Sequence, residues 1–170
     1  MTSVSKGIEP AIHHHGKPTM KQTVAALTCS LVLLAPPTWA DENPVIVDAL
    51  SSYLDFAEYS SSLIWPEQIP KEDWKKVFIV DARDAAQFAK EHIAGAVNIE
   101  WRQAVARRTE LPTDRMVVVY CNSGSLSAQA VFALRLLGHD NVKVLQDGFD
   151  GWKNKGGFDA HVRASQPSGH

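Results

Sequence analysis

The sequence predicts an α/β domain with a largely parallel sheet. Two observations support this fold class: segments with apolar residues at helical spacing alternate with short apolar runs, and the two strongest runs, at 77–80 and 116–120, are uninterrupted. A continuous run rich in β-branched residues is typical of a strand that is covered on both faces. Alternating strands and helices favour parallel pairing. With 170 residues, of which 45% are hydrophobic, the chain is long enough to bury such a core.

The elements before the first strong strand have recognisable start signals. Asn43 followed by Pro44 is typical of a helix N-terminus, and apolar residues at helical spacing extend this helix to Tyr59. A short strand is predicted at 63–65. A second short helix is predicted to begin at Pro70, where two following carboxylates suit the positive end of the helix dipole.

The elements after the first strong strand continue the alternation. Asp84 is predicted to cap a helix, with Gln87 completing a capping box. The pattern then predicts a short strand at 97–99, a helix at 101–108, the strand at 116–120, a long helix that ends at Gly138, a strand at 142–145 and a short helix around Trp152.

The first forty residues are expected to be absent from the mature protein. Residues 20–40 carry a lysine, a short apolar run and small residues before an expected cleavage after Ala40, which is the pattern of a secretory signal peptide. Residues 1–19 are interpreted as an upstream leader, with translation starting at Met20. The mature protein is then expected to be periplasmic or secreted, without a membrane anchor. Lipidation of Cys29 is disfavoured, because the apolar run continues past it.

The charge and the cysteine count exclude several classes of function. The net charge is −2 and no cluster of basic residues is present, so the sequence does not indicate nucleic-acid binding. The two cysteines cannot form a disulfide framework or a structural metal site. Because Cys29 lies in the signal peptide, Cys121 is expected to be alone in the mature protein. A solitary cysteine is a buried inert residue, an intermolecular disulfide partner or a reactive thiol.

The position of Cys121 favours a reactive thiol. It stands directly after the strongest strand and before a polar, glycine-containing loop that leads into a helix. Backbone N–H groups of residues 122–127 can form a concave cradle for negative charge, and the helix N-terminus adds a partial positive charge. Gly124 permits a backbone conformation that a side chain would oppose. These effects favour the thiolate, so Cys121 is predicted to be a nucleophile.

Four motifs of the chain are similar to those of single-domain rhodaneses. They are D-A-R at 81–83, E-H-I-A-G-A at 91–96, the cysteine loop, and G-F-D-G-W at 148–152, in the order and spacing of that family. The resemblance, to thiosulfate sulfurtransferase-like proteins of the exported bacterial type, divides the mature chain into an N-terminal helix at 41–60, a rhodanese domain at 61–157 and a flexible tail at 158–170.

The resemblance implies a five-stranded, mainly parallel sheet flanked by helices, and a sulfurtransferase that needs no metal or organic cofactor. Cys121 would take a sulfane sulfur from thiosulfate or a persulfide donor and become a persulfide. It would pass this sulfur to a thiophilic acceptor, cyanide in an assay or a thiol in the cell. The sulfur would be bound by the residues of the cysteine loop, namely Asn122, Ser123, Gly124, Ser125, Leu126 and Ser127.

One departure from the family pattern bears on the function. Leu126 stands where many members have arginine, so a sulfur carrier or binding module without thiosulfate turnover is an alternative, and Arg102 is a candidate substitute for the missing charge. A phosphatase of this fold would need an arginine six residues after the nucleophile, where the chain has Ser127, and this function is disfavoured. Four residues of the motifs are interpreted as structural: Asp81, Arg83, His92 and Trp152.

Overall fold

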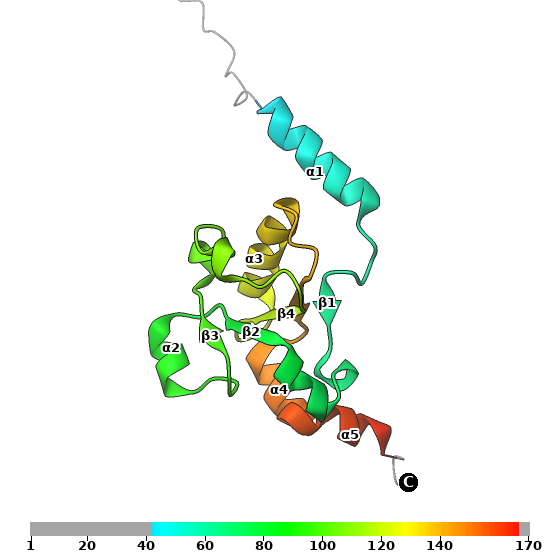
Figure 1. The fold of residues 1–170 in the computed structure, drawn as a ribbon, viewed down its shortest axis with the longest axis vertical. Coiled ribbons are helices and arrows are strands. Elements are labelled where there is room, and N and C mark those ends of the chain that lie inside the picture. The colour runs from blue at the N-terminus through cyan, green and yellow to red at the C-terminus, as the bar shows by residue number, and fades with distance from the viewer. Residues whose placement is uncertain (1–41, 167–170) are drawn as a thin grey trace, which may run out of the picture. The chain divides into compact units, whose positions relative to one another are not determined.

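The computed structural model describes residues 42–166 (Figure 1). The predicted leader at 1–19 and the predicted signal peptide at 20–40 lie outside the described residues. Helix α1 (Pro44–Phe56) comes first, and all described residues belong to one compact unit. Within residues 42–166, no helix is long and apolar enough to cross a membrane.

A five-stranded sheet with the strand order β1-β5-β4-β2-β3 forms the centre of this unit. All four pairings between neighbouring strands are parallel, which confirms the predicted fold class. The central strand β4 pairs with β5 on one side and with β2 on the other. The strands are β1 (Leu63–Ile64), β2 (Phe78–Asp81), β3 (Val97–Asn98), β4 (Val117–Tyr120) and β5 (Val142–Leu145).

Strand β4 is buried on both faces, as its uninterrupted apolar run predicts. Val117 and Val119 belong to a core that α3 (Ser125–Leu136) covers, while Val118 and Tyr120 belong to a second core with Phe149 of α4 (Gly148–Lys155). Figure 1 shows α3 and α4 on opposite sides of the central strands. Successive side chains of a strand point to opposite faces, so a strand between two helical layers needs apolar residues at every position.

The helices begin at the predicted capping residues. The Asn43 side chain accepts a hydrogen bond from the Val45 N–H at 3.1 Å, and α1 ends at Phe56 rather than at Tyr59. Asp84 caps α2 (Ala85–Lys90) by accepting from the Gln87 N–H at 2.9 Å. The segments after β1 form two short 3₁₀ helices, η1 (Pro66–Gln68) and η2 (Lys71–Lys76), the second of which follows Pro70 as predicted.

The helix predicted at 101–108 does not form as one element. The structure has two 3₁₀ turns, η3 (Trp101–Gln103) and η4 (Arg108–Glu110), joined by irregular turns. Ala104 is the one fully buried residue of residues 101–108, so no continuous apolar face supports a longer helix. The prediction of a regular helix was therefore wrong here.

The segment predicted as a flexible tail is also ordered over most of its length. It continues from η5 (Gly157–Asp159) into α5 (Ala160–Ser165), and Ala160 is fully buried. The Phe158 ring contacts the Trp74 ring edge to face at 5.4 Å, and the His161 ring lies 2.8 Å from the Glu67 carbonyl oxygen. These contacts with η1 and η2, far away in sequence, explain why local composition did not reveal them.

Candidate active site at the carboxyl edge of the sheet

Cys121 directly follows the last residue of the central strand. Its side chain is 2% exposed, and it is a free thiol. Helix α3 begins four residues later, at Ser125. The thiol thus lies at the carboxyl edge of a parallel sheet and beside a helix N-terminus, where α/β folds concentrate their chemistry.

The cysteine loop, residues 121–127, is held by its outward-facing carbonyl groups. The carbonyl oxygens of Cys121 and Asn122 accept hydrogen bonds from the N–H groups of Phe149 at 2.8 Å and Asp150 at 3.1 Å. This approach requires glycine at position 148, because a Cβ atom there would stand 2.5 Å from the Cys121 carbonyl oxygen. With its carbonyls engaged by α4, the loop can present N–H groups toward the sulfur.

Two hydrogen-bond donors contact the Cys121 sulfur. The Gly124 N–H donates to Sγ at 3.2 Å, and the Ser127 hydroxyl lies 3.6 Å from Sγ. Gly124 adopts φ +101°, which is the left-handed conformation predicted for this position. Ser127 is fully buried, and its hydroxyl also lies 2.9 Å from the Gly124 carbonyl oxygen, so its single proton is shared between that oxygen and Sγ.

Hydrogen bonds from the cysteine loop lower the pKa of the Cys121 thiol. Burial acts to raise this pKa, but hydrogen bonds from the backbone and side chain of Ser127 outweigh it, together with backbone bonds at Ser123 and Leu126. The net result is a pKa below the ordinary value of a thiol. A hydrogen bond to the anion favours the charged form, so the loop prepares a thiolate.

The other predicted loop residues do not all turn toward the sulfur. The Asn122 amide points away, donating to Gln87 Oε1 at 2.8 Å. The Ser123 and Ser125 hydroxyls lie 3.4 Å from each other, and both residues are exposed. Leu126 is 38% exposed, so an apolar side chain lies at the surface five residues after Cys121. Gly124 and Ser127 make the hydrogen bonds to Sγ at 3.2 and 3.6 Å, and the backbone groups of Ser123 and Leu126 also lower the pKa of the thiol.

A buried ion pair supports the loop from the neighbouring strand. Asp81, at the end of β2, is fully buried and bonds to Arg83 through both carboxylate oxygens. Arg83 Nη1 donates to Asn122 Oδ1 at 3.3 Å, and Nη2 donates to the Glu91 carbonyl oxygen at 2.7 Å. The D-A-R motif therefore has the structural role that was predicted, and it also contacts the cysteine loop.

The remaining charged or aromatic candidates have local partners. Arg102 pairs with Glu100 at 2.9 Å, and its side chain is 73% exposed. The His92 ring stacks on Phe88 at 4.0 Å, and its Nδ1 lies 2.8 Å from the Phe88 carbonyl oxygen. Trp152 packs between Phe149 and Phe158. Over residues 42–166, no three histidine, cysteine or acidic side chains gather in a way that could hold a metal ion.

Comparison with known proteins assigns the chain to a family. The rhodanese-like domain family matches residues 66–155, which is over half of the chain, and the chain belongs to this family. The match includes the cysteine loop, the D-A-R motif and α4. Among the solved structures, a rhodanese-related protein from Thermoplasma volcanium superposes with a TM-score of 0.51 at 26% identity, covering 55% of this chain and 92% of that chain.

Several curated relatives carry names that refer to sulfur transfer. A sulfurtransferase of Allochromatium vinosum is 36% identical over 84 residues, covering 49% of this chain and 78% of the relative. The thiosulfate sulfurtransferase GlpE of Shewanella oneidensis is 37% identical over 78 residues, covering 46% and 77%. The uncharacterized protein YqhL of Bacillus subtilis is 34% identical, and this chain spans 65% of its length. The likeness supports a rhodanese-type sulfurtransferase at the level of the family.

Proposed function

We propose that the protein is a sulfurtransferase in which Cys121 carries the transferred sulfur as a persulfide. The observation that carries this proposal is the cradle of donors at Sγ, formed by the Gly124 N–H at 3.2 Å and the Ser127 hydroxyl at 3.6 Å. Such a cradle stabilises an anion on the cysteine, either the thiolate or the outer sulfur of a persulfide.

The reaction proceeds by two displacements. The Cys121 thiolate attacks the sulfane sulfur of a donor R–S–S⁻ or thiosulfate, a new S–S bond forms, and the donor's own S–S bond breaks. The leaving group, a thiolate or sulfite, departs with the electron pair of that bond. A thiol or cyanide acceptor then attacks the outer sulfur, and Cys121 leaves as the thiolate. The lowered pKa of Cys121 serves both steps, since the same sulfur is the nucleophile first and the leaving group second.

The charges around the loop favour a persulfide donor over thiosulfate. Arg83 is neutralised by Asp81, Lys153 lies 3.2 Å from Glu91, and Arg102 is bound to Glu100. Leu126 supplies an exposed apolar side chain in the first turn of α3. These three cations are already paired, so a dianionic donor gains little from them; Lys90, which lines a pocket together with Asn122, is the cation of that pocket that forms no ion pair within residues 42–166. A donor whose sulfur is attached to an organic group needs less positive charge and can pack against Leu126.

A sulfur carrier that is loaded by a persulfide and does not turn over thiosulfate is the second candidate. The exposure of Leu126 favours this candidate. An exposed leucine near a buried thiol suits contact with another molecule better than binding of a small anion. The two candidates share the Cys121 persulfide and differ in the donor that forms it.

Intact mass spectrometry of the purified protein distinguishes these candidates. After incubation with cysteine persulfide, we expect a gain of about 32 Da, the mass of one sulfur, as the covalent intermediate requires. With thiosulfate we expect the same gain more slowly. Cys121→Ala is expected to show neither gain. A gain from the persulfide alone would identify the sulfur carrier, and no gain from either donor would overturn sulfur transfer.

The role of position 126 is tested by Leu126→Arg with Leu126→Met as the matched control. A guanidinium beside the loop should raise the rate of loading from thiosulfate by roughly tenfold through a charge-assisted contact. The methionine variant keeps the apolar character and should leave the rate unchanged. An unchanged rate in the arginine variant would show that charge at this position does not limit the use of thiosulfate.

A further inference from the structure

The turn between β5 and α4 contains a strained residue. Asp147 has φ +61° and ψ +6°, which is the left-handed conformation. The other residues with a positive φ within residues 42–166 are glycines, which adopt this conformation without strain. A residue with a side chain loses free energy there, although aspartate tolerates the conformation better than most. Such a residue persists where its surroundings hold it in place, and strained residues concentrate at functional sites.

The Asp147 carboxylate is held by two partners. Lys155 Nζ lies 3.3 Å from Oδ2, and the Gln146 amide donates to Oδ1 at 3.1 Å. Lys155 is the last residue of α4, whereas Asp147 immediately precedes its first residue, so the ion pair joins the two ends of this helix. Side chains of an α-helix point back toward its N-terminus, and this direction brings the lysine toward the aspartate.

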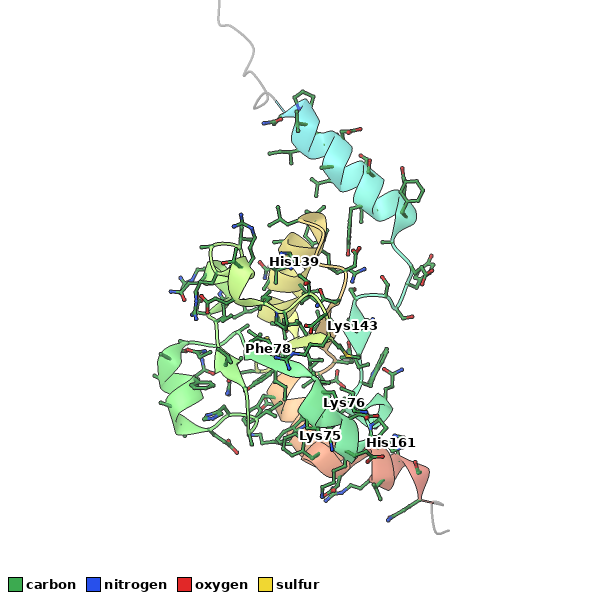
Figure 2. All side chains as sticks on the ribbon, viewed as in Figure 1. Lys75, Lys76, Phe78, His139, Lys143 and His161 are labelled. Atoms are coloured by element: carbon green, nitrogen blue, oxygen red, sulfur yellow. The ribbon has the colours of Figure 1, made fainter. Side chains whose placement is uncertain are left out.

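A second carboxylate fixes the lysine. Lys155 Nζ also lies 3.1 Å from Glu67 Oε1, and these two side chains are only 27% and 29% exposed. Glu67 belongs to η1, and its carbonyl oxygen lies 2.8 Å from Nδ1 of His161 on α5 (Figure 2). The lysine is therefore attached to a segment outside α4. Because solvent and salt screen partly buried pairs less than exposed ones, this arrangement can hold the aspartate in place.

The turn at Asp147 places α4 against the cysteine loop. The N–H groups of residues 149 and 150, two and three positions later, donate to the carbonyl oxygens of residues 121 and 122 at 2.8 and 3.1 Å. Asp147 also lies next to the loop itself, because its backbone nitrogen is 3.9 Å from the position that a Cβ atom on Gly124 would occupy. The conformation of residue 147 thus determines where the donors of α4 stand.

The orientation of the loop carbonyls determines the orientation of the loop N–H groups. The Asn122 carbonyl and the Ser123 N–H belong to one planar, trans peptide unit, so they point in opposite directions. While α4 binds this carbonyl, the N–H points away from α4, and hydrogen bonding at the Ser123 backbone is one of the causes that lower the pKa of Cys121. A shift of α4 that lets the unit rotate would turn this donor away from the sulfur.

We propose that Asp147 and Lys155 are positioning residues for Cys121. Their ion pair holds residue 147 in the left-handed conformation, and this conformation sets α4 against the carbonyl groups of the cysteine loop. Within residues 42–166, no hydrogen bond joins either residue to Sγ, so both act through the backbone. The consequence for catalysis rests on the proposed sulfurtransferase function, whereas the effect on the Cys121 thiol does not.

The experiment is the pH dependence of alkylation by iodoacetamide, which reacts with the thiolate and needs no sulfur transfer. Peptide mass spectrometry follows Cys121 separately from Cys29. We expect Lys155→Met and Asp147→Ala each to move the midpoint of the rate–pH profile to higher pH. The rate on the acidic side should fall about threefold, the size expected for one partly exposed ion pair. Charge effects alone would move the two midpoints in opposite directions, because one variant loses a cation and the other an anion.

Asp147→Gly separates the conformation from the charge. It removes the same carboxylate as Asp147→Ala, but glycine adopts a φ of +61° without strain, so its midpoint should shift less. Lys71→Met is the control for the loss of an ion pair between distant segments, because Lys71 pairs with Asp159 at 2.8 Å. Its midpoint should stay unchanged. Circular dichroism establishes that each variant is folded.

Several outcomes would overturn the positioning role of Asp147 and Lys155. They are unchanged midpoints, opposite shifts in Lys155→Met and Asp147→Ala, equal shifts in Asp147→Ala and Asp147→Gly, and an equal shift in Lys71→Met. Loading from cysteine persulfide is measured on the same samples. The expected alkylation profiles, together with no loading of the unmodified protein, would support the positioning role and contradict sulfur transfer.

Discussion

The cysteine loop and helix α1 are held in very different ways. In the loop, carbonyl groups of residues 121 and 122 accept bonds from α4, Ser127 is fully buried, and Gly148 leaves no space for a side chain. In α1, none of the 13 residues is buried, and Tyr53 provides the aromatic contact with the rest of the unit, at 5.2 Å from Phe132.

This difference indicates which region needs a fixed geometry. A thiolate held by N–H donors needs a backbone that does not relax, because a hydrogen bond weakens steeply when its angle departs from linear. Helix α1 has no such requirement, and its exposed apolar residues contribute little to the unit described here. Substitutions in the two regions should therefore differ strongly in both stability and sulfur loading.

The largest effect is expected for Gly148→Ala. The new Cβ would meet the Cys121 carbonyl oxygen at 2.5 Å and the Asn122 carbonyl oxygen at 2.6 Å, at a backbone φ of +59°. The loop must then move, and we expect a loss of at least about 3 kcal/mol in the free energy of unfolding, together with loss of sulfur loading. Chemical denaturation and intact mass measure the two effects.

Gly138→Ala is the matched control for this change. Gly138 also has a positive φ, +87°, but a Cβ there meets nothing within 4 Å. Backbone strain alone should cost about 1–2 kcal/mol and leave loading intact. If the two alanine variants lose equal stability, the close approach of α4 to the loop does not constrain the site.

The sequence predicted the parts of this site that depend on local pattern. Four consecutive apolar residues define β4, and a glycine three residues after Cys121 marks the left-handed turn that precedes α3. The direction of the Asn122 side chain was not predictable, because it depends on Gln87, 35 residues away. The close approach of Gly148 to the carbonyl groups of Cys121 and Asn122 was not predictable for the same reason, because it joins two segments that are distant in the chain.

Two predictions were wrong, the regular helix at 101–108 and the flexible tail after residue 157. The physical reasons differ. Residues 101–108 contain helix-forming residues, but only Ala104 among them is fully buried, so no apolar face supports a continuous helix. Residues 158–165 are ordered because Phe158 contacts Trp74 and His161 contacts Glu67, 94 positions earlier in the chain. Composition carries no signal for such contacts.

An intermediate effect is expected for Ser127→Ala. Because the Ser127 hydroxyl is one of the groups that lower the pKa of Cys121, its removal should raise this pKa, while the backbone N–H at position 127, which alanine keeps, continues to lower it. The loading rate follows the fraction of thiolate, so it rises with pH up to the pKa and is constant above it. The midpoint of the rate–pH profile should move to higher pH, and the rate on the acidic side should fall about fivefold.

Ser125→Ala provides the control for this prediction. Its hydroxyl lies 3.4 Å from that of Ser123, and no hydrogen bond joins it to the sulfur within the described residues. Its pH profile should match that of the unmodified protein. An unshifted midpoint in Ser127→Ala would mean that the backbone donors, rather than this hydroxyl, determine the state of the thiol.

The smallest effect is expected for Tyr53→Ala in α1. The change removes the edge-to-face contact with Phe132, which should lower the free energy of unfolding by about 0.5–1 kcal/mol, the range for one aromatic pair. Phe56→Ala is the control, because Phe56 is 87% exposed and should contribute nothing measurable. Both variants should load sulfur at the unmodified rate, since neither residue contacts the cysteine loop. Denaturation and loading are measured on the same samples. A loss above about 2 kcal/mol in Tyr53→Ala would show that α1 is bound far more tightly than one aromatic contact allows, and the contrast with the cysteine loop would then not hold.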